Sequence, residues 1–164
     1  MKKFVITTIE RNDRLALLTK ELEEQGCHDV ELDRAPLALS DPMQEISRRH
    51  KSLITRAYHE PQILIMEDDV KFVAPGALNR FLNLMHHLPR DWDLFLAGMS
   101  SGTVKPFTVE GIRKLEHFTG IQCYIVNKKF YDTFLQADER INLDIWLAKQ
   151  NENRDEDAGI DKGL

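Results

Sequence analysis

A short apolar stretch that ends in three consecutive carboxylates constrains this chain more than any other feature of its sequence. It runs from Ile63 to Val70 and reads ILIMEDDV. Four large apolar residues in a row, after the breaker Pro61, predict a strand buried on both faces, because a half-exposed strand would alternate apolar and polar residues. The carboxylates then fall at the carboxyl end of the strand, where open α/β sheets bind their ligands.

The three carboxylates are Glu67, Asp68 and Asp69. Like charges at one strand end repel, so a fold that keeps them together usually offsets them with a cation. Oxygen ligands favour magnesium, calcium or manganese over zinc. A polar turn after the strand is the plainer interpretation, and the spacing alone leaves both open.

Strands and helices are expected to alternate on both sides of this stretch. The expected strands are 4–9, 29–32, 63–66, 93–97 and 121–126, with a further one at 105–109, and the expected helices begin at 12 or 13, 42, 77, 128 and 143. Asn12 or Asp13 is the expected cap of the first helix, which should stop near Gly26, and the last helix is expected to run from 143 to 150. Asp41 and Pro42, with Gln44 behind them, predict a capped helix start. Strand, helix and strand at the amino end predict a βαβ unit. Apart from the strand expected at 105–109, the region 98–120 shows only a mobile turn at 100–102.

The composition is that of a soluble globular protein with one domain. The chain has 164 residues, 42% of them hydrophobic and 30% charged, so we expect a single domain over 1–150 and a polar, frayed tail over 151–164. A net charge of −5 argues against binding nucleic acid by bulk electrostatics.

Nothing in the sequence predicts a signal peptide or a transmembrane segment, which leaves contact with a membrane surface open. Cys27 and Cys123 lie far apart and match no zinc spacing, so we expect reduced thiols in a cytoplasmic protein, with one disulfide as the alternative. The oligomeric state cannot be read from these features.

Six pieces of sequence follow one another in a distinctive order. They are 5–7 with Arg11 and Arg14, then His50, 63–70, 92–94, 119–126 and 142–147. Together they resemble glycosyltransferase family 25, which includes bacterial lipooligosaccharide β-galactosyltransferases and procollagen galactosyltransferases. The resemblance covers most of residues 3–148, and ILIMEDDV is its most specific part.

The resemblance implies a GT-A-like, Rossmann-type α/β/α sandwich with a mixed, mostly parallel central sheet. It also implies metal-dependent, inverting transfer of a hexose, such as galactose from UDP-galactose, to a glycan or other hydroxyl acceptor. The transfer reaction itself needs a metal ion and a carboxylate. Mn²⁺ or Mg²⁺ stabilises the negative charge on the departing diphosphate, and the carboxylate takes the proton of the acceptor hydroxyl.

By this resemblance the acidic cluster holds the metal and the nucleotide-sugar donor. Asp69 is the direct metal ligand, and Glu67 binds the metal, its water or the ribose. Asp68 points elsewhere and is grouped with the donor-binding residues. Arg11 and Arg14 reach toward the diphosphate or uracil, although exposed helix arginines are commonly just solvated.

Further residues receive roles in the same way. Asp144 is the expected catalytic base, with a plain acid at a helix N-terminus as the alternative. His117 is the expected third metal ligand, with a surface or core histidine as the alternative. His50 matches the second member of the family's Ser-His pair, but Arg49 replaces the serine, so we expect His50 to be structural or near the donor. Cys123 and Tyr124 are expected to be core residues.

The departures from the family pattern motivate a second hypothesis. Glu45 and Ile46 stand where Gly-Cys is usual, and the chain becomes an acidic tail soon after the late helix. A catalytically inactive GT-A-like binding or assembly module would account for both. A metal-dependent phosphohydrolase or nucleotidyltransferase is a third hypothesis, against which the sequence lacks a phosphate-cradling GxxxxGK[ST] loop.

Overall fold

A five-stranded mixed sheet forms the centre of the protein. The computed structural model describes residues 1–36 and 41–158, with side chains up to residue 150. The strands β1 (Lys2–Thr8), β2 (Glu31–Ala35), β3 (Gln62–Glu67), β4 (Leu94–Leu96) and β7 (Cys123–Asn127) lie in the order β2-β1-β3-β7-β4. β1 is parallel to β2 and β3, whereas β7 is antiparallel to β3 and β4.

The predicted mixed sheet is therefore confirmed. Four of its five strands run in the same direction, and β7 runs against them. Two of its four pairings are antiparallel because β7 enters the sheet in the opposite direction. An apolar run such as that of β7 predicts a buried strand without giving its direction.

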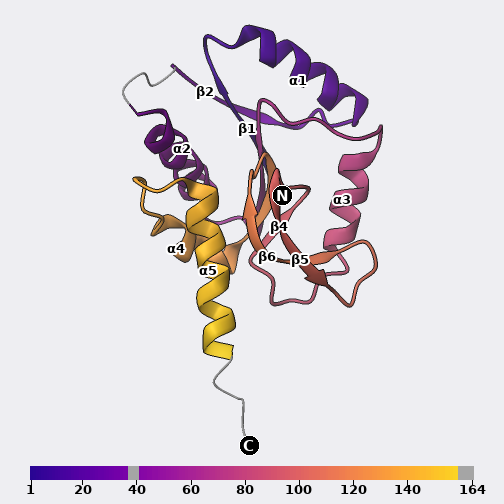
Figure 1. The fold of residues 1–164 in the computed structure, drawn as a ribbon. Coiled ribbons are helices and arrows are strands. Elements are labelled where there is room, and N and C mark those ends of the chain that lie inside the picture. The colour runs from indigo at the N-terminus through magenta and orange to yellow at the C-terminus, as the bar shows by residue number, and fades with distance from the viewer. Residues whose placement is uncertain (37–40, 159–164) are drawn as a thin grey trace, which may run out of the picture.

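Helices cover both faces of the sheet (Figure 1). One core lies under α1 (Asn12–Glu24) and α3 (Ala77–Met85), and the other under α2 (Pro42–Arg56), α4 (Tyr131–Leu135) and α5 (Leu143–Ala158). Within β3, Ile63 and Ile65 belong to one core and Leu64 and Met66 to the other, all 0% exposed. This division confirms burial on both faces and explains why the run does not alternate.

The ends of the first two long helices differ in how well the sequence predicted them. Asp41 caps α2 as expected, because its side chain accepts a hydrogen bond from the Gln44 amide at 3.0 Å, and Pro42 is the first helical residue. The expected side-chain cap of α1 is wrong, since Arg11 occupies the N-cap position without a capping hydrogen bond. α1 stops near Gly26 as expected, since its last helical residue is Glu24 and the φ of 66° at Gly26 lets the chain reverse.

A hairpin occupies the region that the sequence left unassigned. β5 (Ser101–Pro106) and β6 (Arg113–Thr119) pair antiparallel in a separate two-stranded sheet, so the expected strand at 105–109 and the mobile turn at 100–102 are wrong. Every residue of β5 is exposed, and the strand therefore shows no apolar alternation. Gly102 is required here, because a Cβ at this position would lie 2.2 Å from the carbonyl oxygen of His117.

The carboxyl end of the chain is more helical than expected. After a 3₁₀ turn at Lys128–Phe130 and the short α4, α5 extends to Ala158, past the expected end at residue 150. The last part of the expected tail, 159–164, lies outside the described residues. Among the described residues, no helix combines the length and the apolar character needed to cross a membrane.

Both cysteines are buried and free, so the structure contains no disulfide between them. Cys27 and Cys123 lie in the core beneath α1 and α3. Burial raises the pKa of the Cys123 thiol to about 12. Both thiols therefore serve as small apolar core residues.

Gln25 joins the end of α1 to the start of α3. Gln25 is only 3% exposed. Its side-chain amide nitrogen donates to the carbonyl oxygen of Ala74 at 3.0 Å, and its side-chain amide oxygen accepts from the backbone amide of Leu78 at 3.1 Å. The N-cap of α3, Gly76, has no side chain to cap that helix, so Gln25 takes over this task.

Gln25→Ala is expected to lower the free energy of unfolding by about 1–3 kcal/mol, because it leaves the buried amide of Leu78 without its acceptor. The carbonyl oxygen of Ala74 loses one donor but still accepts from the amide of Ala77. Urea denaturation measures the change. Gln136→Ala is the matched control, since Gln136 is also the C-cap residue of a helix but is exposed, and it should change stability by less than about 0.5 kcal/mol. Equal effects of the two substitutions would contradict the capping role of Gln25.

Candidate functional site

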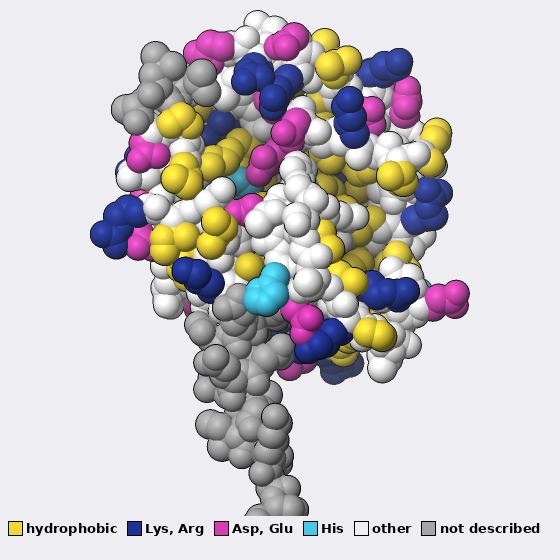
Figure 2. All heavy atoms as spheres, in the orientation of Figure 1, with side chains coloured by type: hydrophobic (Ala, Val, Ile, Leu, Met, Phe, Trp, Pro, Cys, Tyr) yellow, Lys and Arg dark blue, Asp and Glu magenta, His cyan; other side chains and the backbone are white. Residues whose placement is uncertain are grey.

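A cavity of about 1020 Å³ opens between α3, β4 and the β5–β6 hairpin. Figure 2 shows apolar side chains gathered in a hollow beside α3. Most of the lining is apolar, with aromatic residues that include Phe81, Trp92, Phe95 and Phe118. Asp69 also lines this cavity, and it connects the cavity to the acidic cluster.

The acidic cluster lies at the carboxyl ends of the parallel neighbours β1 and β3. Glu67 is the last residue of β3, and Asp68 and Asp69 follow it directly. Thr7 comes from the end of β1, while Arg14 comes from the first turn of α1. The predicted position of the cluster, outside the carboxyl end of a central strand, is confirmed.

Both carboxylate oxygens of Asp68 are used inside the protein. The hydroxyl of Thr7 donates to Oδ2 at 2.8 Å, and Nη1 of Arg14 donates to Oδ1 at 3.1 Å. The Asp68 side chain is only 11% exposed. It therefore holds Arg14 in place and joins α1 to the end of β3.

Asp69 is the more open carboxylate. Its side chain is 46% exposed, and its Oδ2 lies 3.7 Å from Nη1 of Arg14. Burial, followed by the negative charge of Glu67, raises the pKa of Asp69, while Arg14 opposes the shift. At Asp69, burial together with the neighbouring carboxylates thus outweighs the opposing effect of Arg14 on the pKa.

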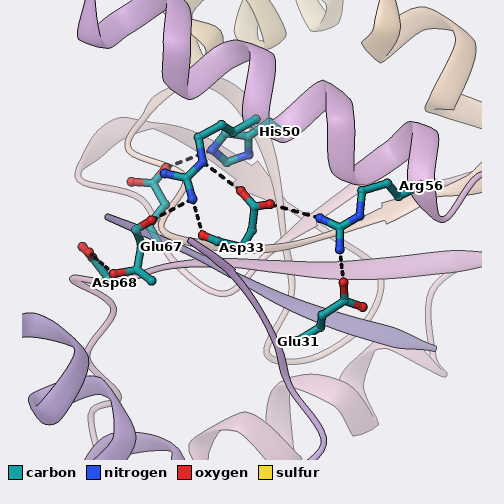
Figure 3. Close-up of polar contacts among 8 residues, drawn as sticks. Glu31, Asp33, His50, Arg56, Glu67 and Asp68 are labelled. Atoms are coloured by element: carbon teal, nitrogen blue, oxygen red, sulfur yellow. Dashed lines mark hydrogen bonds and ion pairs between the residues drawn. The ribbon is translucent and has the colours of Figure 1, made fainter. Parts of the chain in front are cut away.

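Glu67 faces a buried histidine from α2. Its Oε1 lies 3.4 Å from Nε2 of His50 (Figure 3). On the other side of the ring, Nδ1 of His50 lies 2.5 Å from the hydroxyl of Tyr124. His50 thus belongs to the site, whereas the sequence left its role as structural or near the donor. Tyr124, interpreted from the sequence as core, is indeed fully buried, but its hydroxyl extends this polar chain.

Arg49 connects α2 to β1 and β2 beside the site, and the sequence did not predict this role. It is buried, donates from Nε to Oδ2 of Asp33 at 2.8 Å and from Nη2 to the backbone oxygens of Thr7, at 2.7 Å, and of Asp33. Position 49 lies three residues after Ile46 and four before Leu53, both of which contact the core. Helical spacing therefore indicates that Arg49 faces inward.

The other predicted site residues lie apart from these contacts. Arg11 is exposed at the start of α1. His117 is exposed on β6, opposite Thr103. Asp144 accepts hydrogen bonds from the amides of Gly120, at 2.8 Å, and Ile145, at 2.7 Å, as an acid in the first turn of a helix does. Their roles in donor binding, metal binding and catalysis stay predictions.

The donor set of the cluster fits a hard divalent cation. Glu67 and Asp69 supply oxygen ligands, and a divalent cation would offset the negative charge of these two neighbouring carboxylates. Within the part of the chain that the structure describes, no group of three or more His, Cys, Asp and Glu side chains is arranged to hold a metal ion. One or two carboxylates suffice when substrate phosphates complete the coordination, as is usual for Mg²⁺.

Comparisons with known proteins do not identify a family for this chain. No model of a known protein family matches it, and no curated protein sequence matches it significantly. A function must therefore be argued from the residues and geometry described above.

Proposed function

We propose that this protein is a metal-dependent glycosyltransferase that moves a hexose from a nucleotide sugar to a glycan or other hydroxyl acceptor. One observation carries the proposal: Glu67 and Asp69 stand at the carboxyl end of β3, and Asp69 opens onto the large cavity. The parallel order β2-β1-β3 followed by antiparallel β7 agrees with a GT-A-like arrangement. The two free thiols agree with a cytoplasmic location.

The donor diphosphate is placed beside the acidic cluster in this proposal. Glu67 and Asp69 would hold Mn²⁺ or Mg²⁺, which when bound stabilises negative charge on the leaving diphosphate. Arg14 is fixed by its bond to Asp68 and presents a positive charge at the same place. A guanidinium held in this way suits phosphate oxygens through charge-assisted hydrogen bonds.

The transfer step needs a base on the acceptor side. The acceptor oxygen forms a bond to the anomeric carbon while the bond from that carbon to the diphosphate oxygen breaks, which inverts the configuration. The acceptor's hydroxyl proton goes to a carboxylate, for which Asp144 is the proposed residue. The cavity beside α3 offers the acceptor room next to Asp69.

Asp144→Asn separates catalysis from structure at this position. The amide oxygen of asparagine can still accept from the Gly120 amide, so the fold should persist, whereas the transfer rate is expected to fall by at least about 100-fold because the base is lost. The assay incubates the protein with Mn²⁺, a panel of nucleotide sugars and mixed saccharide acceptors, and measures nucleoside diphosphate release. Thermal unfolding is followed in parallel.

The same assay distinguishes the competing functions. Asp144→Asn with wild-type transfer would contradict the role of Asp144 as base and leave it as a helix-capping acid. Release of inorganic phosphate or nucleoside monophosphate by the wild type would favour a phosphohydrolase. Nucleotide binding without any turnover across the panel would favour a catalytically inactive module.

A further inference from the structure

Three side chains form a buried polar chain that leads from the core under α2, α4 and α5 to the acidic cluster. It joins Tyr124 of β7, His50 of α2 and Glu67 of β3, which come together from three different elements. Figure 3 shows the end of this chain, where His50 faces Glu67. Tyr124 is 0% and His50 1% exposed. Glu67, with a side chain that is 28% exposed, is the one member of the chain that reaches solvent.

Packing fixes the orientation of the histidine ring. The rings of His50 and Tyr124 stack with centroids 5.8 Å apart and planes 20° apart, and Tyr124 stacks in turn on Phe134. His50 Nδ1 lies 2.5 Å from the Tyr124 hydroxyl. With one ring nitrogen held, the other is aimed at Glu67.

The position of the protons follows from these contacts. Burial, followed by the charge of Glu67, raises the pKa of Tyr124 well above its usual value, so the phenol keeps its proton. When this hydroxyl donates to Nδ1, the proton of a neutral imidazole resides on Nε2. Nε2–H then faces Glu67, whose carboxylate is an acceptor.

This N–H is a buried donor whose acceptor is only just within reach. Oε1 of Glu67 lies 3.4 Å away, and among the described residues Nε2 of His50 has no partner with hydrogen-bond geometry. A buried donor without a partner is destabilising, so rotation of the Glu67 carboxylate toward it is favoured. The backbone of Glu67 is already fixed, because its amide donates to the carbonyl oxygen of Gln122 at 2.8 Å.

We propose that Tyr124 and His50 form a positioning pair that orients the Glu67 carboxylate, so that one oxygen faces His50 and the other is presented to a divalent cation. This inference rests on the proposed function of the acidic cluster. Hydrogen bonds to ligating groups typically change metal affinity by about 10- to 100-fold. The pair thus sets how strongly the cluster binds the cation, without touching substrate.

Mn²⁺ titrated alone into the full-length protein by calorimetry tests the pair. His50→Asn keeps a polar group near the position of Nδ1 and removes the donor toward Glu67, so Mn²⁺ affinity should fall by about 10- to 100-fold. His50→Gln places an amide near the position of Nε2 and should restore most of that affinity. Tyr124→Phe releases the ring and should weaken binding less than His50→Asn.

Tyr131→Phe is the matched control. Tyr131 is also 0% exposed, and its hydroxyl has no hydrogen-bond partner among the described residues, so its removal should leave Mn²⁺ affinity unchanged. Thermal unfolding of each variant identifies any loss that comes from misfolding, and rescue by glutamine must occur at equal stability.

The outcomes separate the inference from the proposed function. Wild-type affinity in both His50→Asn and Tyr124→Phe would overturn the positioning pair while leaving the metal site intact. Equal loss in the asparagine and glutamine variants would also overturn it, since the donor toward Glu67 would then be irrelevant. A wild-type protein that binds no Mn²⁺ would overturn both the proposed function and the inference.

Discussion

Asp69→Asn is expected to remove most Mn²⁺ binding and sugar transfer while leaving the protein at least as stable as the wild type. The loss of Mn²⁺ affinity should exceed about 100-fold, because even residues that only support metal ligands change affinity by about 10- to 100-fold. Stability should be kept because the raised pKa of Asp69 means that the folded protein disfavours its charged form. A neutral amide removes the cost of burying a charge at this position, and also the repulsion from Glu67.

Calorimetry with Mn²⁺, the transfer assay and thermal unfolding together measure this prediction. Asp91→Asn is the control, since Asp91 also lines the cavity but pairs with Lys129 and lies outside the acidic cluster. Its substitution should change none of the three. An Asp69→Asn protein that binds Mn²⁺ and transfers sugar like the wild type would contradict the assignment of the metal site.

Arg49→Ala is expected to lower the free energy of unfolding by about 3 kcal/mol, the lower end for breaking a buried ion pair. Arg49 is 8% exposed in its side chain and holds Asp33 of β2 as well as the backbone oxygen of Thr7. Its removal leaves these acceptors without their main donor. Arg56, at 3.0 Å from Oδ1 of Asp33, still offsets part of the charge, which is why we expect the lower end.

Urea denaturation compares this variant with Arg48→Ala. Arg48 is its neighbour on α2, but its side chain is 53% exposed and pairs with Glu139 at the surface. A surface ion pair contributes about 0–1 kcal/mol, so the control should be nearly neutral. Equal destabilisation by the two substitutions would mean that Arg49 is not the link between α2 and the two strands.

The sequence predicted those parts of the fold that local chemistry specifies. The apolar run of β3 located the central strand, Asp41 with Pro42 located the start of α2, and Gly26 located the end of α1. In each case the signal lies within a few residues of the feature it predicts, because caps and periodicity act over one or two turns.

The remaining parts depend on partners that are distant in the chain. Thr7 meets Asp68 across 61 residues, and His50 meets Tyr124 across 74 residues. No local pattern indicates such pairs, nor the direction of β7. The hairpin β5–β6 was missed because its first strand is wholly exposed and shows no apolar pattern.

The candidate site was predicted in outline and changed in its details. The carboxylates were placed at the correct strand end. Arg14 pairs with two of them, while its predicted contact with the donor stays a prediction. The roles of His50, Arg49 and Tyr124 emerged only in the structure, since each depends on its side chain being turned toward a partner on another element. Arg49, which replaces the expected serine, became a structural centre of the site.

Titration of UDP into the wild-type protein, with and without Mn²⁺, tests the central claim most directly. The proposal predicts that UDP binds measurably only when Mn²⁺ is present, because the diphosphate completes the coordination that Glu67 and Asp69 begin. Absence of UDP binding in both conditions, or equal binding in both, would contradict a metal-dependent donor site at the end of β3.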